Sequence, residues 1–447
     1  MVGQDLGMVE IVTLEANPGL LALPWQTPLA EWPRDVTVSM PRGISRNVVR
    51  FVALRPALAQ GEGLGEEVYA VKELPEWIAR KEYRLLVELD RLGLPVAEAA
   101  AVVAGRTSVD GDPLPGAVLT KYVRFSLPFR ALFAADPDAA TAERLLDALV
   151  VLLVRLHLAG FMWSDCSLSN TLFRRDAGQF EAYLVDAETG ELHPKLSAGQ
   201  RAWDVELATE KCAGELLDIQ AGGLLAHGDP IEMGLSIGPR YVRLWELVTG
   251  ELRVRPDQMW RLDERIRQLQ QAGFDVEELS MATALGEAGQ EVVIRPRVVE
   301  SGFNSRRLLS LTGLDTGENQ ARRLLSDIEA FRIAGMPEAN QEAAARAWLA
   351  RQYQPLVAAV PHHLRGRLEP PEVYHEVLEH RWYLCQQESR DVPWEEAVAR
   401  YIAEILEHKP DEVVLSQAES VPVPPASADP DPTPEAVAES PGPMPLR

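Results

Sequence analysis

Two carboxylates and one side-chain amide lie close together in the second quarter of the 447-residue chain. Asp165 and Asn170 are five residues apart in WSDCSLSNTLF, and Asp186 follows the apolar run AYLV. An aspartate with no basic partner can accept the proton of an alcohol, and this is the role that we expect for Asp165. Asn170 and Asp186 offer the oxygen ligands that Mg²⁺ prefers.

A lysine and a glutamate upstream add two further groups to this set. Lys72 lies near the end of the strand-like run EVYAVKEL, and Glu82 lies on the predicted helix that follows. A lysine that is held by an ion pair can bind phosphate oxygens. Phosphoryl transfer needs positioning and charge neutralisation rather than covalent help from the protein, and these groups supply both.

The pattern of strands and helices that must position these residues predicts a two-lobed molecule. Residues 35–54 alternate apolar and polar side chains about Gly43, residues 67–74 form a further strand, and residues 77–95 have helical spacing. The strand-like runs AAAVVAG and GAVLTKYV precede long helical patterns that begin near residue 127. Strands with one helix, followed by helices, favour an α+β fold over a doubly wound sheet.

The composition limits the partners and the compartment. The chain has 44 Lys and Arg residues against 67 Asp and Glu residues, and its net charge of -23 disfavours broad binding to nucleic acid or anionic lipid. Three scattered cysteines exclude a disulfide framework and fit a reducing compartment. No targeting segment or apolar run of transmembrane length is visible. We therefore expect a cytoplasmic protein that binds no nucleic acid and has no transmembrane segment.

The spacing around Asp165 resembles the catalytic loop of protein kinases, H-x-x-G-x-x-H-R-D-x-x-x-x-N. The matching residues are His157, Gly160, Asp165 and Asn170, with Trp163 and Ser164 in place of the His-Arg pair. Lys72 in VYAVK is similar to the strand lysine of V-A-I-K, and Asp186 in VDAETG to the metal-binding aspartate of D-F-G. Asp204 in RAWDVELA resembles the helix aspartate that braces the catalytic loop in kinase-like folds.

More narrowly, the chain resembles bacterial kinase-like proteins of the lipopolysaccharide-kinase type. It is most similar to a bacterial family that joins a kinase-like half to a C-terminal domain of unknown function. The phrases DCSLSNTLFRRDAG, LVDAETGELHP, LTGLDTGENQARRLL and EVYHEVLEHRWYLCQQESRDV carry this second resemblance. It implies a bilobal protein-kinase-like fold that uses ATP and Mg²⁺. The implied roles are phosphate binding by Lys72, support of that lysine by Glu82, catalysis by Asp165, and Mg²⁺ binding by Asn170 and Asp186.

Departures from the kinase pattern bear on the substrate. No G-x-G-x-x-G precedes Lys72, so backbone amides around Gly43, or the side chains of Arg42, Ser45 and Arg46, would have to hold the phosphates. Ser164 stands where regulated kinases place arginine, and Asp204 follows Asp186 by only 18 residues with no A-P-E between them. These features favour a sugar, glycolipid or small-molecule hydroxyl acceptor over a regulated protein target. The alternative is a catalytically inactive pseudokinase that acts as a nucleotide-sensing scaffold or regulatory binding module.

Composition and pattern divide the chain into five predicted segments. They are an N-terminal extension (1–34), a kinase-like N-lobe (35–123), a kinase-like C-lobe (124–225), a mainly helical C-terminal domain of unknown function (226–417) and a disordered Pro/Ala-rich acidic tail (418–447). Residues 200–285 have mostly helical patterns, and residues 291–302 read as a strand. We expect the C-terminal domain to offer a binding surface for a protein partner.

Overall fold

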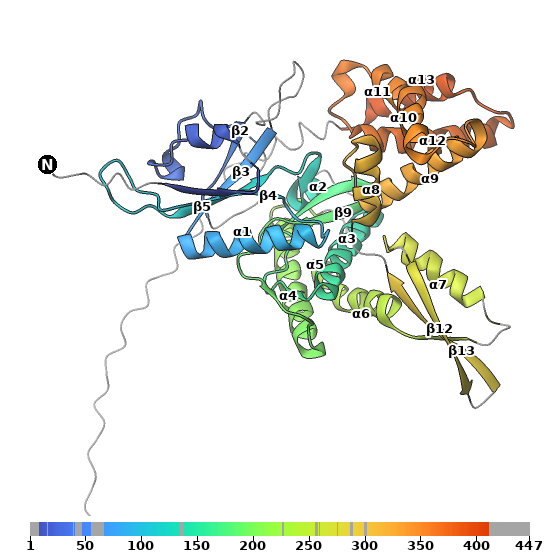
Figure 1. The fold of residues 1–447 in the computed structure, drawn as a ribbon, viewed down its shortest axis with the longest axis horizontal. Coiled ribbons are helices and arrows are strands. Elements are labelled where there is room, and N and C mark those ends of the chain that lie inside the picture. The colour runs from blue at the N-terminus through green and yellow to red at the C-terminus, as the bar shows by residue number, and fades with distance from the viewer. Residues whose placement is uncertain are drawn as a thin grey trace, which may run out of the picture.

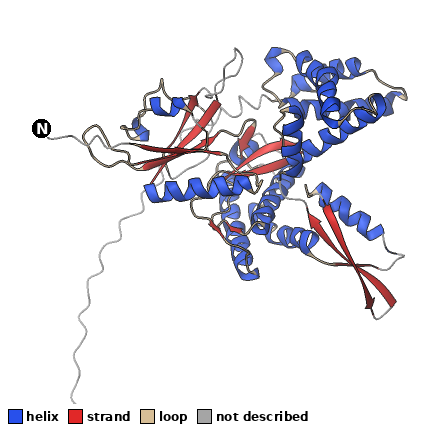
Figure 2. Cartoon of the chain, viewed as in Figure 1, coloured by secondary structure: helices blue, strands red, loops and turns tan. Residues whose placement is uncertain are grey.

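The computed structural model describes residues 9–15, 17–38, 40, 47–54, 67–134, 138–225, 228–254, 258, 260–274, 276–286, 289–298 and 302–410. Within these residues the protein is a mixed α+β molecule, with a strand-rich N-terminal lobe and a helical remainder (Figures 1 and 2). This confirms the predicted fold class of a small β-rich lobe, a helical lobe and a mainly helical C-terminal part.

A five-stranded antiparallel sheet forms the first lobe, in the order β1–β4–β5–β3–β2. Its strands are β1 (Glu10–Thr13), β2 (Val49–Leu54), β3 (Glu67–Leu74), β4 (Ala99–Ala104) and β5 (Gly116–Lys121). Strand β3 is the strand predicted at residues 67–74. It lies between β2 and β5, where Lys72 pairs with Val49 on one side and Val118 on the other. The lysine therefore projects from an interior strand, which fixes its backbone.

Two apolar layers hold this sheet, one on each face. Helix α1 (Glu76–Arg91) follows β3 directly and packs against β4 and β5 (Figure 1). Because side chains alternate along a strand, Val118 belongs to the core on the α1 side and Leu119 to the core on the other side. That second core is completed by the N-terminal residues Leu20, Leu23, Trp25, Leu29 and Trp32.

The N-terminal segment is thus part of this lobe. Strand β1, which lies within residues 1–34, pairs with β4 at the sheet edge. Two strands were predicted within residues 35–54. The second is β2, and in the first Val38 forms an isolated bridge to Phe51 of β2. Gly43, about which that hairpin was predicted, lies outside the described residues. The β1 strand escaped sequence analysis because its partner lies some 90 residues away.

The second lobe is built on helix α3 (Ala139–Leu158), a largely buried helix within the region where long helical patterns were predicted. A small sheet, in the order β6–β8–β9, packs beside α3; its strands are β6 (Ser126–Pro128), β8 (Thr171–Asp176) and β9 (Gln179–Leu184). The short strands β7 (Phe161–Met162) and β10 (Glu191–Leu192) pair with one another. The other helices are α2 (Phe129–Ala134), α4 (Ala198–Ala221), α5 (Pro230–Leu235) and α6 (Ile237–Thr249).

The C-terminal part begins with a small β-unit and ends in a bundle of helices (Figure 2). The β-unit contains helix α7 (Trp260–Gln271) and the strands β11 (Leu252–Val254), β12 (Val276–Gly286) and β13 (Gly289–Val298). Residues 276–285 therefore form a strand where sequence analysis expected mostly helical patterns. Pairing along nearly the whole of β13 decides their conformation, since β propensity depends strongly on the partner strand.

A separate apolar core organises the last helices. They are α8 (Phe303–Thr312), α9 (Glu318–Gly335), α10 (Gln341–Trp348), α11 (Gln354–Ala359), α12 (Pro370–Glu388) and α13 (Trp394–Glu404). Trp348, Tyr374 and Tyr401 are fully buried at its centre. The domain boundaries given above stay a prediction. No helix in the described part of the chain is both long and apolar enough to cross a membrane.

Candidate active site

Lys72 is the point where separate elements of the first two lobes meet. Its Nζ lies 3.3 Å from Glu82 Oε1 on α1 and 2.6 Å from Asp186 Oδ2 in the segment after β9. The expected contact between Lys72 and Glu82 is thus present in the structure, and Asp186, which was expected to bind Mg²⁺, also contacts the lysine. Burial alone would lower the pKa of Lys72, but the carboxylates of Glu82 and Asp186 outweigh it and raise that pKa. The ammonium stays charged, as phosphate binding requires.

A third carboxylate, which sequence analysis missed, completes this cluster. Glu188 Oε2 lies 2.9 Å from Lys72 Nζ and accepts a hydrogen bond from Asn47 Nδ2 at 3.3 Å. The Glu188 amide also donates to Asp186 Oδ1 at 3.1 Å. No local pattern in the sequence indicates Glu188, because this residue lies in the turn that follows Asp186 and not on a strand.

The cluster has the donor chemistry that suits a divalent cation. One carboxylate oxygen each from Glu82, Asp186 and Glu188 lies within 4.8 Å of the other two. Three carboxylates against one ammonium leave excess negative charge in a partly buried space. Burial raises the pKa of Glu82, and the neighbouring acids raise it further, while Lys72 opposes them. Oxygen ligands with excess negative charge fit Mg²⁺, so the residues present agree with the predicted metal.

Helix α4 fixes the loop that contains Asp165. Asp204 accepts hydrogen bonds from the Trp163 amide at 2.7 Å and the Ser164 amide at 2.9 Å. His157 is buried and lies 3.1 Å from the same carboxylate, so it is part of the support and not a base. Ser164 has a φ of 62°, a left-handed conformation that a serine adopts only when its surroundings impose it. Asp204 thus has the bracing role expected of it.

The loop's entry requires a glycine. Gly160 has a φ of 85°, and a Cβ at this position would lie 2.0 Å from the carbonyl oxygen of His193. The His193 amide in turn donates to the Gly160 carbonyl at 2.9 Å. The β7–β10 contact therefore brings the chain past the loop too closely for any side chain at residue 160.

Asp165 and Asn170 are joined through the loop itself. Asn170 Nδ2 donates to the Asp165 carbonyl oxygen at 3.1 Å. The Asn170 carbonyl accepts from the Val185 amide at 3.2 Å, because β8 and β9 pair immediately after and before these residues. Asp186 follows Val185, and the Asp186 carbonyl accepts a hydrogen bond from Trp163 Nε1 at 3.0 Å. The hairpin and the loop thus bring Asn170 next to the segment that supplies Asp186.

One premise of the sequence analysis was wrong. Asp165 does have a basic partner, because Lys211 Nζ on α4 bonds its Oδ1. Glu215, one turn further along α4, accepts from the Leu168 amide at 2.7 Å and the Ser169 amide at 3.1 Å. Lys211 and Glu215 lie 7 and 11 residues after Asp204, so the three share one helix face. That spacing was the available signal.

Gly43 is the one predicted site residue whose placement the structure leaves open. It lies outside the described residues, as do its neighbours in PRGISRN up to Arg46. The predicted phosphate contact through its backbone stays a prediction.

Comparisons with known protein families bear on this geometry. Residues 60–208 match the lipopolysaccharide kinase (Kdo/WaaP) family, and residues 243–406 match a domain of unknown function, DUF4032. The chain thus joins a region that is similar to lipopolysaccharide kinases, called here the lipopolysaccharide-kinase-like region, to a region that matches DUF4032, called here the DUF4032 domain. This confirms the resemblance found in the sequence. Lys72, Glu82 and Asp186 lie inside the matched residues of the first family, as does the whole of the loop, whereas Lys211 follows them.

Among solved structures, the chain is similar to WaaP in complex with acyl carrier protein. The sequence identity is 16%, the TM-score is 0.31, and the similarity covers 59% of this chain and 99% of that chain. A comparison with curated proteins gave no match.

The DUF4032 domain forms hydrogen bonds with the lipopolysaccharide-kinase-like region at the turn of the β8–β9 hairpin. Glu372, at the start of α12, accepts from the Ala177 amide at 2.9 Å and the Gly178 amide at 3.0 Å. In the reverse direction, Asp176 accepts from the Asn319 amide at 3.0 Å and the Gln320 amide at 2.6 Å, at the start of α9. Asp176 of the hairpin thus satisfies two amides in the first turn of α9, and Glu372 of α12 satisfies two amides of the hairpin turn.

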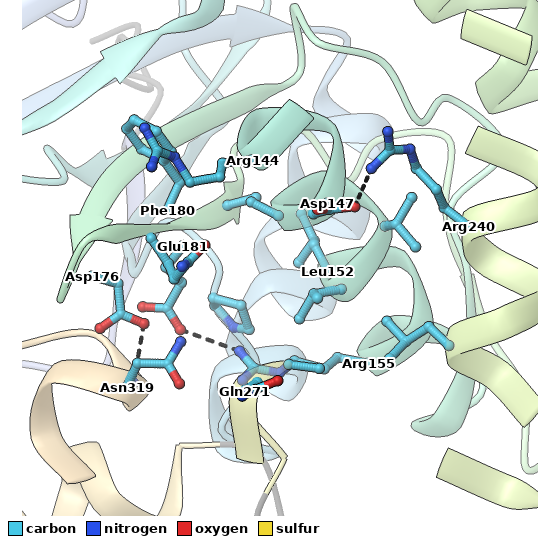
Figure 3. A pocket seen from close by; sticks show the side chains of 18 of the residues that line it. Arg144, Asp147, Leu152, Arg155, Asp176, Phe180, Glu181, Arg240, Gln271 and Asn319 are labelled. Carbon is cyan, nitrogen blue, oxygen red and sulfur yellow. Dashed lines mark hydrogen bonds and ion pairs between the residues drawn. The ribbon is translucent and has the colours of Figure 1, made fainter. Parts of the chain in front are cut away.

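A cavity of about 610 Å³ adjoins this contact (Figure 3). Arg155 crosses it, donating to Glu181 at 3.2 Å and to the Gly273 carbonyl at 2.9 Å. Burial raises the pKa of Glu181, and Asp176 nearby raises it further, while Arg155 opposes them. None of the described residues that line this cavity is a predicted site residue, so it belongs to the junction and not to the Lys72 cluster.

The contact between Glu372 and the β8–β9 turn should make the free energy of unfolding depend on pH. Burial raises the pKa of Glu372 from 4.5 to about 7, although the two amides that it accepts oppose this shift. The folded protein therefore keeps a proton that the unfolded chain loses, and the free energy of unfolding falls as the pH rises from about 4.5 to about 7. In the Glu372→Gln variant we expect this fall to be smaller by on the order of 2 kcal/mol. Urea denaturation at about pH 5 and about pH 8 measures it.

The matched control for that measurement is Glu395→Gln, at an exposed position in the first turn of α13. It should leave the pH dependence of unfolding unchanged. An equal pH dependence in Glu372→Gln and the unsubstituted protein would contradict the assignment.

Proposed function

We propose that the lipopolysaccharide-kinase-like region is an ATP- and Mg²⁺-dependent phosphotransferase whose acceptor is a hydroxyl group of a sugar, a glycolipid or another small molecule. The observation that carries the proposal is the convergence of Glu82 and Asp186 on Lys72, from a helix and a loop that are distant in sequence. The family match to residues 60–208 supports the same class of reaction.

In the proposed reaction, the acceptor oxygen forms a bond to the γ-phosphorus while the bond from that phosphorus to the β–γ bridging oxygen breaks. The hydroxyl proton passes to Asp165, and ADP leaves. Lys72 holds phosphate oxygens, and Asn170 and Asp186 are the residues that would hold Mg²⁺, which neutralises phosphate charge when bound. The braced loop keeps Asp165 in place so that little reorganisation is needed during transfer.

Binding of nucleotide is tested most directly by thermal unfolding. With ATP and Mg²⁺ at about 100 times the dissociation constant, we expect stabilisation by about 2.7 kcal/mol, which appears as a rise of several degrees in Tm. ATP with EDTA and Mg²⁺ alone should each give a smaller rise. The absence of a rise with both together would contradict the proposal and favour a scaffold that does not bind nucleotide.

Transfer itself is tested with γ-labelled ATP, purified protein and separated sugar, glycolipid and protein fractions of a cell extract. Label in a sugar or glycolipid fraction supports the proposed acceptor, and label in protein contradicts it. A Tm rise without label in any fraction would favour the nucleotide-sensing pseudokinase. The cytoplasmic location and a protein partner for the DUF4032 domain stay predictions from the sequence.

A further inference from the structure

Lys211 is a cation placed beside the residue proposed to take the acceptor's proton. Its amine bonds one carboxylate oxygen of Asp165, and among the described residues no other side chain forms a hydrogen bond or ion pair with that carboxylate. The second oxygen, Oδ2, is left for another partner. Both side chains remain in contact with solvent, with 35% of Lys211 and 28% of Asp165 exposed. The pair therefore lies where an acceptor molecule can reach it.

The position of Lys211 on helix α4 distinguishes this contact from an ordinary surface ion pair. Helix α4 already holds the loop backbone at four amides, two through Asp204 and two through Glu215. Lys211 lies between these two acids on the same face of α4, so the helix controls both the backbone of the loop and the side chain of Asp165. A carboxylate on a loop turns about two side-chain torsions unless a partner fixes it.

We propose that Lys211 is the positioning residue of Asp165: it holds Oδ1 so that Oδ2 faces the acceptor hydroxyl. This inference rests on the proposed phosphotransferase function and adds a residue outside the matched family region. Lys211 acts through Asp165 and takes no part in nucleotide binding, which belongs to the Lys72 cluster on the other segments of the site. Removal of its charge should therefore affect kcat and leave nucleotide affinity unchanged.

The test is steady-state kinetics of Lys211→Met and Lys211→Arg in the full chain. We expect Lys211→Met to lower kcat by about 30-fold, with the KM for ATP changed less than about twofold, because misplacement of a reacting group costs up to about 100-fold. Lys211→Arg should recover most of the rate, since a guanidinium can hold the same oxygen. Lys195→Met, at an exposed position before α4, is the matched control and should be unchanged.

A double variant separates positioning from a general loss of structure. Residues that act as a unit give non-additive losses, so Asp165→Asn with Lys211→Met should be no slower than Asp165→Asn alone. Additive losses, or a raised KM for ATP with unchanged kcat, would overturn the role of Lys211. So would full activity of Lys211→Met in a preparation whose unsubstituted protein transfers phosphate. No transfer by the unsubstituted protein would overturn the proposed function, and this inference with it.

Discussion

Asp165→Asn should lower kcat for phosphoryl transfer by about 10³-fold while the Tm rise with ATP and Mg²⁺ persists. Asparagine has the shape of aspartate but cannot accept the hydroxyl proton, and general-base catalysis is worth about 10² to 10⁴ in rate. Nucleotide binding should survive because Lys72, Glu82 and Asp186 make no described contact with the Asp165 carboxylate. The measurements are single-turnover transfer and thermal unfolding on the same preparation.

The fold should tolerate this change. The loop backbone depends on Asp204 and Glu215, and Asn170 bonds the carbonyl of residue 165 and not its side chain. Asp218→Asn, at an exposed position on α4, is the matched control and should keep full activity. If Asp165→Asn retained more than a tenth of the rate, the proton would leave by another route and the role of Asp165 would be wrong.

Part of this site was predictable because its spacing is local. The loop from His157 to Asn170 is one segment, and its kinase-like spacing indicates the residues directly. Lys72 on a strand and Glu82 on the following helix are also near in sequence, so their contact follows from a short strand-to-helix connection. Asp186 was indicated by the apolar run before it and by its likeness to the D-F-G aspartate, and the β8–β9 hairpin returns the chain to the loop at this point.

Lys211 and Glu188 were missed for different reasons. Lys211 contacts Asp165 across 46 residues, and its helix face matters only once Asp204 is known to brace the loop. Glu188 looked like an ordinary exposed acid, because nothing in a local pattern shows that a loop returns to Lys72. Likewise, the hydrogen bond between the Ala177 amide and Glu372 joins residues 195 positions apart. A periodic pattern in the sequence cannot predict a contact at this separation.

The second large effect is expected at Asp186, whose replacement by asparagine should remove the Mg²⁺ dependence that Asp165→Asn preserves. Asp186 Oδ2 bonds Lys72 and Oδ1 accepts the Glu188 amide. An asparagine has the same shape as aspartate, but its amide nitrogen can accept neither bond, so one of the two contacts is lost. The substitution removes one of the negative charges that favour a divalent cation beside the phosphates. We expect kcat/KM to fall by about 10³-fold, since loss of a positioned charge partner in phosphoryl transfer costs several kcal/mol.

Two measurements show whether Asp186 or Glu188 binds the metal: thermal unfolding, and Mn²⁺ binding followed by electron paramagnetic resonance. For Asp186→Asn, the Tm rise with ATP should be the same with Mg²⁺ as with EDTA, and Mn²⁺ affinity in the presence of ATP should fall at least about tenfold. Asp110→Asn, on an exposed loop, is the matched control. If instead Glu188→Gln abolished Mn²⁺ binding while Asp186→Asn did not, Glu188 and not Asp186 would be the metal-binding residue. Lys72 would then depend on Asp186 for its orientation alone.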